Sequence, residues 1–200
     1  TYNPAGKNAV INGGFDIWQR GTSAAITSSS TSFYGPDRWQ IYRGATGSTV
    51  SRQATSDTTN LPNIQYCARV ARDSGNTSTA VFYMYNNFET VNSISYVGKT
   101  ITLSFYARAG ANYSAASSAL VARVISGTGT DQNYNNTYTG SATVANTTAT
   151  LTTTWQRFTA TGTVGTTANE LVVGFEFTPV GTAGTNDYFE VTGVQLELGS

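Results

Sequence analysis

The clearest alternation of apolar and polar residues in the chain is Lys99-Thr-Ile-Thr-Leu-Ser-Phe-Tyr-Ala-Arg108. Ile101, Leu103 and Phe105 fall on one side of this segment and hydroxyl-bearing residues fall on the other, which is the period of a half-buried β-strand. Similar short segments occur before and after it, and the sequence contains no amphipathic helical pattern. These features predict an all-β chain in which most strands bury one face.

The predicted strands are short and are separated by turns rich in Gly, Asn, Ser and Thr. We expect them within residues 10–19, 38–53, 66–71, 80–85, 99–108, 119–125, 148–161, 170–177 and 187–198, the last with an irregularity at Gly193. Residues 21–32 and 127–138 are expected to be loops, and residues 86–97 are ambiguous, with a short helical turn at 88–92 as one alternative. Roughly eight to ten strands predict a single antiparallel β-sandwich over residues 10–200. Residues 1–9 are expected to be a leader from an upstream segment.

Two segments near the start carry two of the three tryptophans: Asn12-Gly-Gly-Phe-Asp-Ile-Trp-Gln-Arg-Gly21 and Gly35-Pro-Asp-Arg-Trp39. A Trp flanked by alternating apolar residues is usually buried, so we expect Trp18 and Trp39 in the core. These segments are therefore predicted to define the architecture, while ligand contacts lie elsewhere.

The glycines and charged residues of these segments are expected to shape strand ends. Gly13 and Gly14 favour a turn or bulge before Phe15. Asp37 is expected to accept backbone N–H groups or to pair with Arg20. The predicted structural signature is Gly13, Gly14, Phe15, Asp16, Trp18, Asp37, Arg38, Trp39 and Trp155, with Arg38 on the strand face opposite Asp37 and Trp39.

Charged residues make up only 11% of the chain, and eleven basic residues balance eleven acidic ones. A nucleic-acid partner needs a basic patch, and membrane insertion needs an apolar span or a basic amphipathic face; the sequence offers neither. The absence of His removes the Ser-His triad and the commonest transition-metal ligand. The single Cys67 allows no intrachain disulfide, and its strand-like neighbours predict a buried thiol.

The acidic residues raise two functional alternatives. Glycoside hydrolysis needs two carboxylates about 5–9.5 Å apart, and Glu176 and Glu190 are the only pair expected to be able to share a face. Solvated or ion-paired roles are favoured for both, so we expect no enzyme activity. For calcium, Asp16 and Asn186-Asp187 are the best candidates, with turn capping as the favoured alternative. The sequence therefore predicts no cofactor.

Twelve tyrosines are many for this length. Aromatic rings present faces to sugar C–H groups while nearby amides bond to hydroxyls. Tyr83 and Tyr85 share one face of a predicted strand, and the other candidates sit on predicted loops, where ligand contacts are commoner. The predicted ligand-binding residues are Tyr83, Tyr85, Tyr113, Tyr134, Asn135 and Tyr138. Packing in the core or across strands is the alternative for each tyrosine.

Four motifs occur in order along the chain. They are Asn8-Ala-Val-Ile-Asn-Gly-Gly-Phe-Asp-Ile-Trp-Gln-Arg-Gly-Thr22 with Tyr34-Gly-Pro-Asp-Arg-Trp39, then Gly98-Lys-Thr-Ile-Thr-Leu-Ser-Phe-Tyr-Ala-Arg108, Leu151-Thr-Thr-Thr-Trp-Gln-Arg-Phe158 and Val194-Gln-Leu-Glu-Leu-Gly-Ser200. Together they resemble a module of bacteriophage and prophage tail-fibre and other virion structural proteins. That module is similar to jelly-roll carbohydrate-binding modules, whose opening acid and late Asp help to hold a structural calcium. Asp16 stands at the first position, but Thr192-Gly193 stand at the late one, so the calcium site does not carry over.

The resemblance implies a jelly-roll sandwich in a virion protein, on an extracellular tail or capsid appendage. It implies a homotrimer with other virion proteins as partners, and recognition of host surface carbohydrate during adsorption without cleavage. The alternative is a purely structural capsid-decoration or fibre-assembly protein that binds no ligand. A depolymerising tailspike domain is disfavoured because the chain lacks parallel β-helix repeats.

Overall fold

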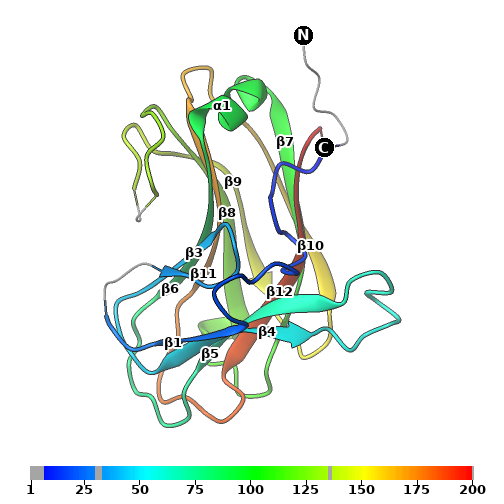
Figure 1. Cartoon of the computed structure of the whole chain (residues 1–200), viewed down its shortest axis with the longest axis vertical. Coiled ribbons are helices and arrows are strands. Elements are labelled where there is room, and N and C mark those ends of the chain that lie inside the picture. Colours follow the sequence, from blue (N-terminus) through cyan, green and yellow to red (C-terminus); the bar gives the residue numbers. More distant parts are fainter. Residues whose placement is uncertain (1–6, 30–32, 135–136, 200) are drawn as a thin grey trace.

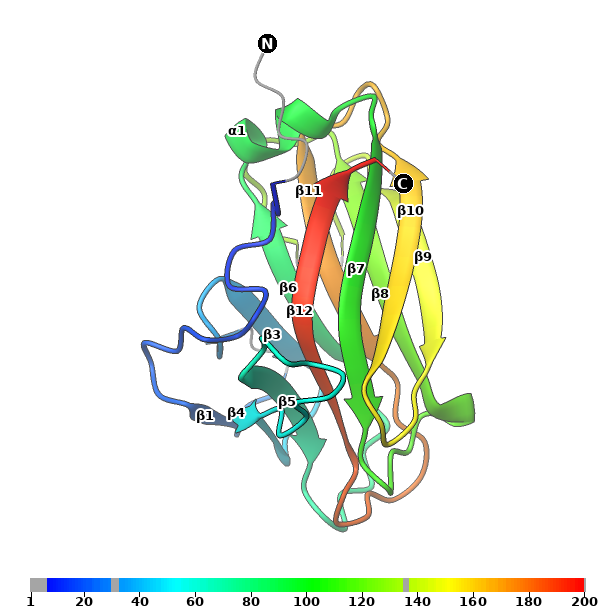
Figure 2. The same cartoon turned by 90° about the vertical axis from the view of Figure 1, so that its right-hand side faces the viewer.

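Two antiparallel sheets of six strands each face one another in the computed structural model, which describes residues 7–29, 33–134 and 137–199 (Figure 1, Figure 2). The first sheet has the order β1 (Ser23–Ile26), β4 (Ser48–Ala54), β5 (Tyr66–Arg72), β12 (Tyr188–Leu198), β7 (Thr100–Ala109) and β10 (Gln156–Thr163). The second sheet has the order β2 (Phe33–Tyr34), β3 (Trp39–Arg43), β6 (Phe82–Phe88), β11 (Glu170–Phe177), β8 (Ala119–Gly127) and β9 (Ala142–Thr150). The predicted antiparallel β-sandwich is confirmed.

The described residues hold twelve strands, against the eight to ten expected. β1 lies in a segment expected to be a loop, β2 is only two residues long, and the single strand expected over 148–161 is divided between β9 and β10. The ambiguous segment contains α1 (Thr90–Ser93) and the 3-10 turn η1 (Ile94–Tyr96), and a second such turn, η2 (Ala116–Ser118), precedes β8. No helix of the described residues is long and apolar enough to cross a bilayer.

The core lies between the two sheets, where alternate residues of facing strands interdigitate. Ile101, Leu103 and Phe105 of β7 are fully buried there, as their alternation predicts. The ring of Phe105 meets the edge of Phe175 from the opposite sheet, with ring centroids 5.0 Å apart. Trp39 is also fully buried, and its ring stacks on Phe175 at 5.9 Å. Burial of each such side chain stabilises the fold by about 1.5–3 kcal/mol.

The strand predicted over residues 10–19 is wrong. Residues 11–14 form a turn, residues 15–18 have no regular structure, and both Asn12 and Phe15 have φ 57°. The cause is the Asn12 side chain: its Oδ1 accepts the Ile17 N–H at 3.0 Å, and its Nδ2 donates to the carbonyls of Ile17 and Asp37 at 2.9 and 3.0 Å. Such local side-chain bonds give the backbone an alternative to a sheet ladder.

Gly13 holds this turn directly against β12. Its carbonyl accepts the Val194 N–H at 3.0 Å, and a Cβ built on Gly13 would lie 2.1 Å from the Val194 carbonyl oxygen. Only glycine permits so close an approach of two backbones. The contact falls at the Gly193 irregularity, where the pairing of β12 with β7 shifts register between Thr192 and Gln195.

Asp37 and Arg38 of the opening segments lie in the turn before β3. Asp37 accepts the Gln19 N–H at 2.6 Å and lies 4.0 Å from Arg20, so both expected interactions occur. Arg38 does not occupy a strand position opposite Trp39, because its φ is 71° and it belongs to the turn before β3. This turn directs its guanidinium toward Glu89, 2.8 Å away.

The two carboxylates expected to be able to share a face lie on opposite faces of the sandwich. Phe175 and Phe177 point inward, so Glu176 points outward from the second sheet, and Glu190 likewise points outward from the first. Glu176 pairs with Arg123 at 3.0 Å. This separation excludes the pair as an acid and nucleophile across one glycosidic bond.

Candidate ligand-binding site

One face of β6 carries polar aromatic side chains away from the core. Phe82, Met84 and Phe88 point inward, so Tyr83, Tyr85 and Asn87 point outward from the second sheet. The ring of Tyr85 lies over Gly174 of the neighbouring strand, where an added Cβ would sit 2.4 Å from a ring carbon. The glycine thus lets the ring lie flat on the sheet.

Two tyrosines of the β8–β9 connection fold back onto this face. The rings of Tyr134 and Tyr138 are 4.9 Å apart, and Tyr134 meets the edge of Tyr85 at 4.8 Å. With Ile125 and Val172 they form a small apolar cluster separate from the main core. Burial raises the pKa of all three hydroxyls above the ordinary value. The rings predicted to contact ligand pack against one another, and they hold the described parts of the β8–β9 connection, residues 128–134 and 137–141 (hereafter the 128–141 loop).

Of the other predicted ligand residues, Tyr83 packs against this cluster, whereas Tyr113 packs against the main core. Tyr113 packs its ring 4.6 Å from Phe177 in the main core, and its hydroxyl donates to the Ala119 carbonyl at 2.9 Å. Tyr83 stacks beside Tyr85 at 5.5 Å and stays half-buried. Asn135 lies outside the described residues.

Trp155 lies outside the main core as well. It packs with Leu61 and Cys67 in a small cluster on the outer side of the first sheet, and its indole N–H donates to the Thr55 carbonyl at 3.3 Å. Trp18 lies in the main core and donates to the Phe15 carbonyl at 2.8 Å. The indole N–H of Trp39 donates to the Asn12 carbonyl, so all three tryptophan N–H groups have a hydrogen-bond partner. All three rings pack against apolar neighbours.

Asn87 connects the 128–141 loop to the sheet. Its Nδ2 donates to Gln40 Oε1 at 3.3 Å and to Asn133 Oδ1 at 3.0 Å. Its Oδ1 accepts the Tyr134 N–H at 2.9 Å and lies 3.1 Å from the Tyr138 hydroxyl. Both donor hydrogens and both acceptor lone pairs of the amide are therefore used. This arrangement fixes the loop over the outer face of β6.

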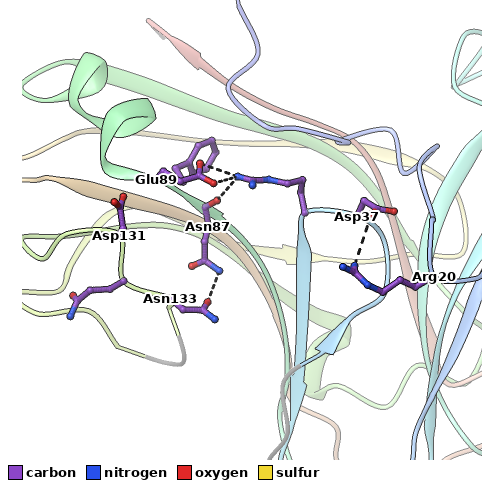
Figure 3. A pocket seen from close by; sticks show the side chains of 9 residues that line it. Arg20, Asp37, Asn87, Glu89, Asp131 and Asn133 are labelled. Atoms are coloured by element: carbon purple, nitrogen blue, oxygen red, sulfur yellow. Dashed lines mark hydrogen bonds and ion pairs between the residues drawn. The ribbon is translucent and has the colours of Figure 1, made fainter.

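A cavity of about 390 Å³ opens between this loop and the turn before β3 (Figure 3). Arg20 and Asp37 lie on one side of it, and Asn87, Glu89, Asp131 and Asn133 lie on the other. Arg38, Phe88 and Gln132 complete the lining. Two guanidinium groups, three carboxylates and three amides thus converge on one space.

The charged groups of the cavity are held in place by their neighbours. Glu89 receives two hydrogen bonds from Arg38, at 2.8 and 3.0 Å, and one from Asn92. Burial alone would raise the pKa of Glu89, but these bonds and one from its own backbone N–H outweigh it, so the pKa lies below the usual value. Asp131 accepts the Thr90 N–H at 2.7 Å and donates its own N–H to the Thr90 hydroxyl. The side chains of Arg38, Glu89 and Asp131 are thus positioned before any ligand arrives.

The calcium candidates from the sequence are used differently. Asp187 is fully buried and pairs with the equally buried Arg72 at 2.8 Å, while its second oxygen accepts the Ser114 N–H. Asp16 is exposed. Across the described ranges, no three Asp, Glu, His or Cys side chains gather as a metal-binding group. The cavity therefore offers many hydrogen-bond donors and acceptors, and its three carboxylates lie too far apart to form a metal-binding group.

No family model matches the chain, and no curated protein sequence matches it. Solved structures do share its fold. The enzymatically active domain of bacteriophage CBA120 tailspike protein 4 superposes with a TM-score of 0.57 at 14% identity, over 96% of this chain but only 21% of that chain. A CBM4 carbohydrate-binding module superposes with a TM-score of 0.54 at 20% identity, over 95% of this chain and 99% of that one.

A third similar structure is a carbohydrate-binding module of the β-sandwich superfamily, with a TM-score of 0.51 at 11% identity over 85% of this chain and 63% of that chain. This chain therefore has the β-sandwich fold of carbohydrate-binding modules. The identities are too low to transfer a ligand or a site, so function must be argued from the cavity itself.

Proposed function

We propose that this protein is a non-catalytic carbohydrate-binding module of a phage tail fibre or appendage, which recognises host surface glycan during adsorption. The observation that carries this proposal is the cavity at the end of β6, between the turn before β3 and the 128–141 loop. Its guanidinium, carboxylate and amide groups suit a ligand rich in hydroxyls, because each hydroxyl both donates and accepts a hydrogen bond. Groups that are already held by neighbours lose little further freedom on binding.

Two half-exposed rings lie on the same outer face of the second sheet as Asn87, which lines the cavity. Tyr42 of β3 and Tyr83 of β6 lie opposite each other in the ladder, with ring centroids 5.9 Å apart, and both are half-buried. Such rings can receive the C–H face of a sugar whose neighbours occupy the cavity. Hydrogen bonds at one end and a ring surface beside them are the combination that glycan recognition requires.

Two kinds of similarity support a role in a phage particle. The four motifs of the sequence resemble virion modules, and the tailspike domain shares the fold. In that setting the protein functions in the virion, outside the cell, as a homotrimer that contacts other virion proteins. Light scattering tests the assembly: a trimer is expected, and a strict monomer would count against the fibre.

The second candidate function is a purely structural virion module that binds no ligand. Exposed apolar residues favour it. Ile11, Val91 and Ile94 are 50%, 73% and 54% exposed. Ile11 and Val91 line a second hollow of about 280 Å³ on the other side of the Arg38–Glu89 pair. Such a surface suits contact with another virion subunit.

A glycan array separates the two candidates. We expect the parent protein to bind a subset of host-type glycans, and Arg20→Gln, Asn133→Ala and Tyr83→Ala each to weaken binding about tenfold or more. Arg157→Gln is the matched control, because Arg157 is exposed on the first sheet, away from the cavity. If the parent protein binds no glycan, or if Arg157→Gln weakens binding as much as the three cavity variants do, the purely structural role is favoured.

A further inference from the structure

The cavity between the 128–141 loop and the turn before β3 carries more negative than positive groups. Three of its lining side chains are carboxylates, whereas two are guanidinium groups: Asp37, Glu89 and Asp131 against Arg20 and Arg38. Acidic and basic residues are equal in number over the whole chain, so the surplus belongs to this place. A recessed surface with a surplus of one charge attracts ligand groups of the opposite charge.

Asp131 differs from the other two carboxylates because it lacks a cationic partner. Glu89 lies 2.8 Å from Arg38, and Asp37 lies 4.0 Å from Arg20. No arginine or lysine of the described residues forms an ion pair with Asp131. The surplus negative charge of the cavity is therefore that of Asp131, which is exposed to solvent.

The Asp131 carboxylate has one oxygen left for a ligand. Its Oδ1 accepts the Thr90 N–H at 2.7 Å, whereas Oδ2 receives no hydrogen bond from the described residues. The carboxyl of Glu170 lies close to the same part of the loop, because its Oε2 accepts the N–H of Gln132 at 2.8 Å. Any charge on the Glu170 carboxyl has the same sign as that of Asp131, so it strengthens the attraction of the cavity for a cationic group.

We propose that the cavity selects saccharides that carry a free ammonium group, and that Asp131 binds this group. The inference rests on the proposed function, because it specifies which glycans the same cavity accepts. An ammonium group has donor hydrogens only, so it fits the ionised Asp131 carboxylate, which accepts only. A neutral sugar hydroxyl gains no charge attraction at this position, and a sugar carboxylate is repelled from it.

The cavity also has room and partners for the rest of the sugar. Its volume of about 390 Å³ falls within the range of small-ligand sites, about 300–1,000 Å³. Asp37 lies across the cavity from Asp131 (Figure 3), and Asn133 Nδ2 donates no hydrogen bond to the described residues. An acceptor and a donor are thus open to the hydroxyls of the same sugar. A basic peptide side chain offers no such hydroxyls, which favours a saccharide as the ligand.

A glycan array of matched sets tests the inference. Each set presents one saccharide backbone in three forms: with a free amine, with that amine acetylated, and with a carboxylate in its place. Exposed ion pairs shift an equilibrium by up to about fivefold, so the parent should bind the amine form about two- to fivefold more tightly than the acetylated form. The carboxylate form should bind least. Calorimetry on the set that binds best measures the ratio.

Asp131→Asn should remove the preference for the amine form. The new amide keeps an oxygen for the Thr90 N–H, and Asn tolerates the φ of 50° at this position, so the variant should fold like the parent. Asp57→Asn is the matched control, because Asp57 also accepts backbone N–H groups but lies in the β4–β5 connection, outside the cavity. This control should keep the preference.

Equal binding of the amine and acetylated forms, or a preference that survives Asp131→Asn, would overturn the inference and leave the proposed function intact. No binding to any set would overturn both. A lysine-rich peptide that competes as well as the amine form would show that charge alone is recognised. That result would assign the cavity to a basic protein partner and would likewise overturn the choice of a saccharide.

Discussion

Asn87→Ala tests whether hydrogen bonds hold the 128–141 loop over the second sheet. The change removes the four bonds of the amide, and the Gln40 side chain and the Tyr134 N–H lose partners in a largely buried place. The Tyr138 hydroxyl keeps the Leu171 carbonyl at 3.2 Å. At about 1 kcal/mol for each bond that is not replaced, we expect the free energy of unfolding to fall by about 2–3 kcal/mol.

Urea unfolding measures this change, and hydrogen exchange at the Tyr134 amide reports whether the loop opens locally. We expect exchange at this amide to accelerate in Asn87→Ala at least tenfold. Asn146→Ala, on the exposed edge strand β9, should stay within about 0.5 kcal/mol of the parent. An Asn87→Ala protein with parent-like stability and exchange would show that tyrosine packing alone holds the loop, which would refute the reasoning.

Gly13→Ala should lower the free energy of unfolding by about 2–3 kcal/mol, because its methyl group would overlap the backbone of β12; Gly165→Ala, which has open space around the added atom, is the control in the same urea experiment. Burial raises the pKa of the Cys67 thiol, so a thiol reagent at pH 8 should fail to label folded protein and should label it in urea; rapid labelling of the folded protein would contradict this. The hydrogen bonds to Glu89 lower its pKa by more than burial raises it. NMR titration of Glu89 should therefore find a midpoint below 4.5, and Arg38→Met should move this midpoint upward. Because the folded pKa is depressed, the contribution of this pair to stability is present above 4.5 and is lost as the pH falls through the folded pKa. A midpoint that Arg38→Met leaves unchanged would mean that the ion pair has no influence on this carboxyl.

Periodicity predicts those strands whose two sides meet different surroundings. The β7 strand is such a case, since its apolar residues face the core and its hydroxyl residues face outward. The segment over residues 10–19 shows a similar alternation but forms no strand, because Asn12 bonds to nearby backbone and Gly13 lies against β12. Such a long-range contact leaves no periodic pattern in the sequence.

The composition of residues 127–138 predicts a loop. It does not predict the direction in which the tyrosine rings of that loop point. Tyr134 and Tyr138 are covered because Gly174, far along the chain, lets Tyr85 lie flat beneath them. The cavity combines residues from three distant segments, around positions 20–38, 87–89 and 131–133. Its charged side chains are conspicuous in a chain with so few charges, yet only the register of β3 with β6 brings the first two segments together.

The few attachment points of the 128–141 loop suggest how new binding preferences could arise in this fold. Asn87, Glu170 and Thr90 belong to the framework, whereas Asp131 and Asn133 belong to the replaceable segment. A transplanted loop that kept a backbone N–H for Glu170 and an amide for Asn87 could present different side chains to the cavity. The sandwich would remain unchanged while the set of ligands that the cavity accepts changed, in the way that antibody frameworks tolerate exchange of their variable loops.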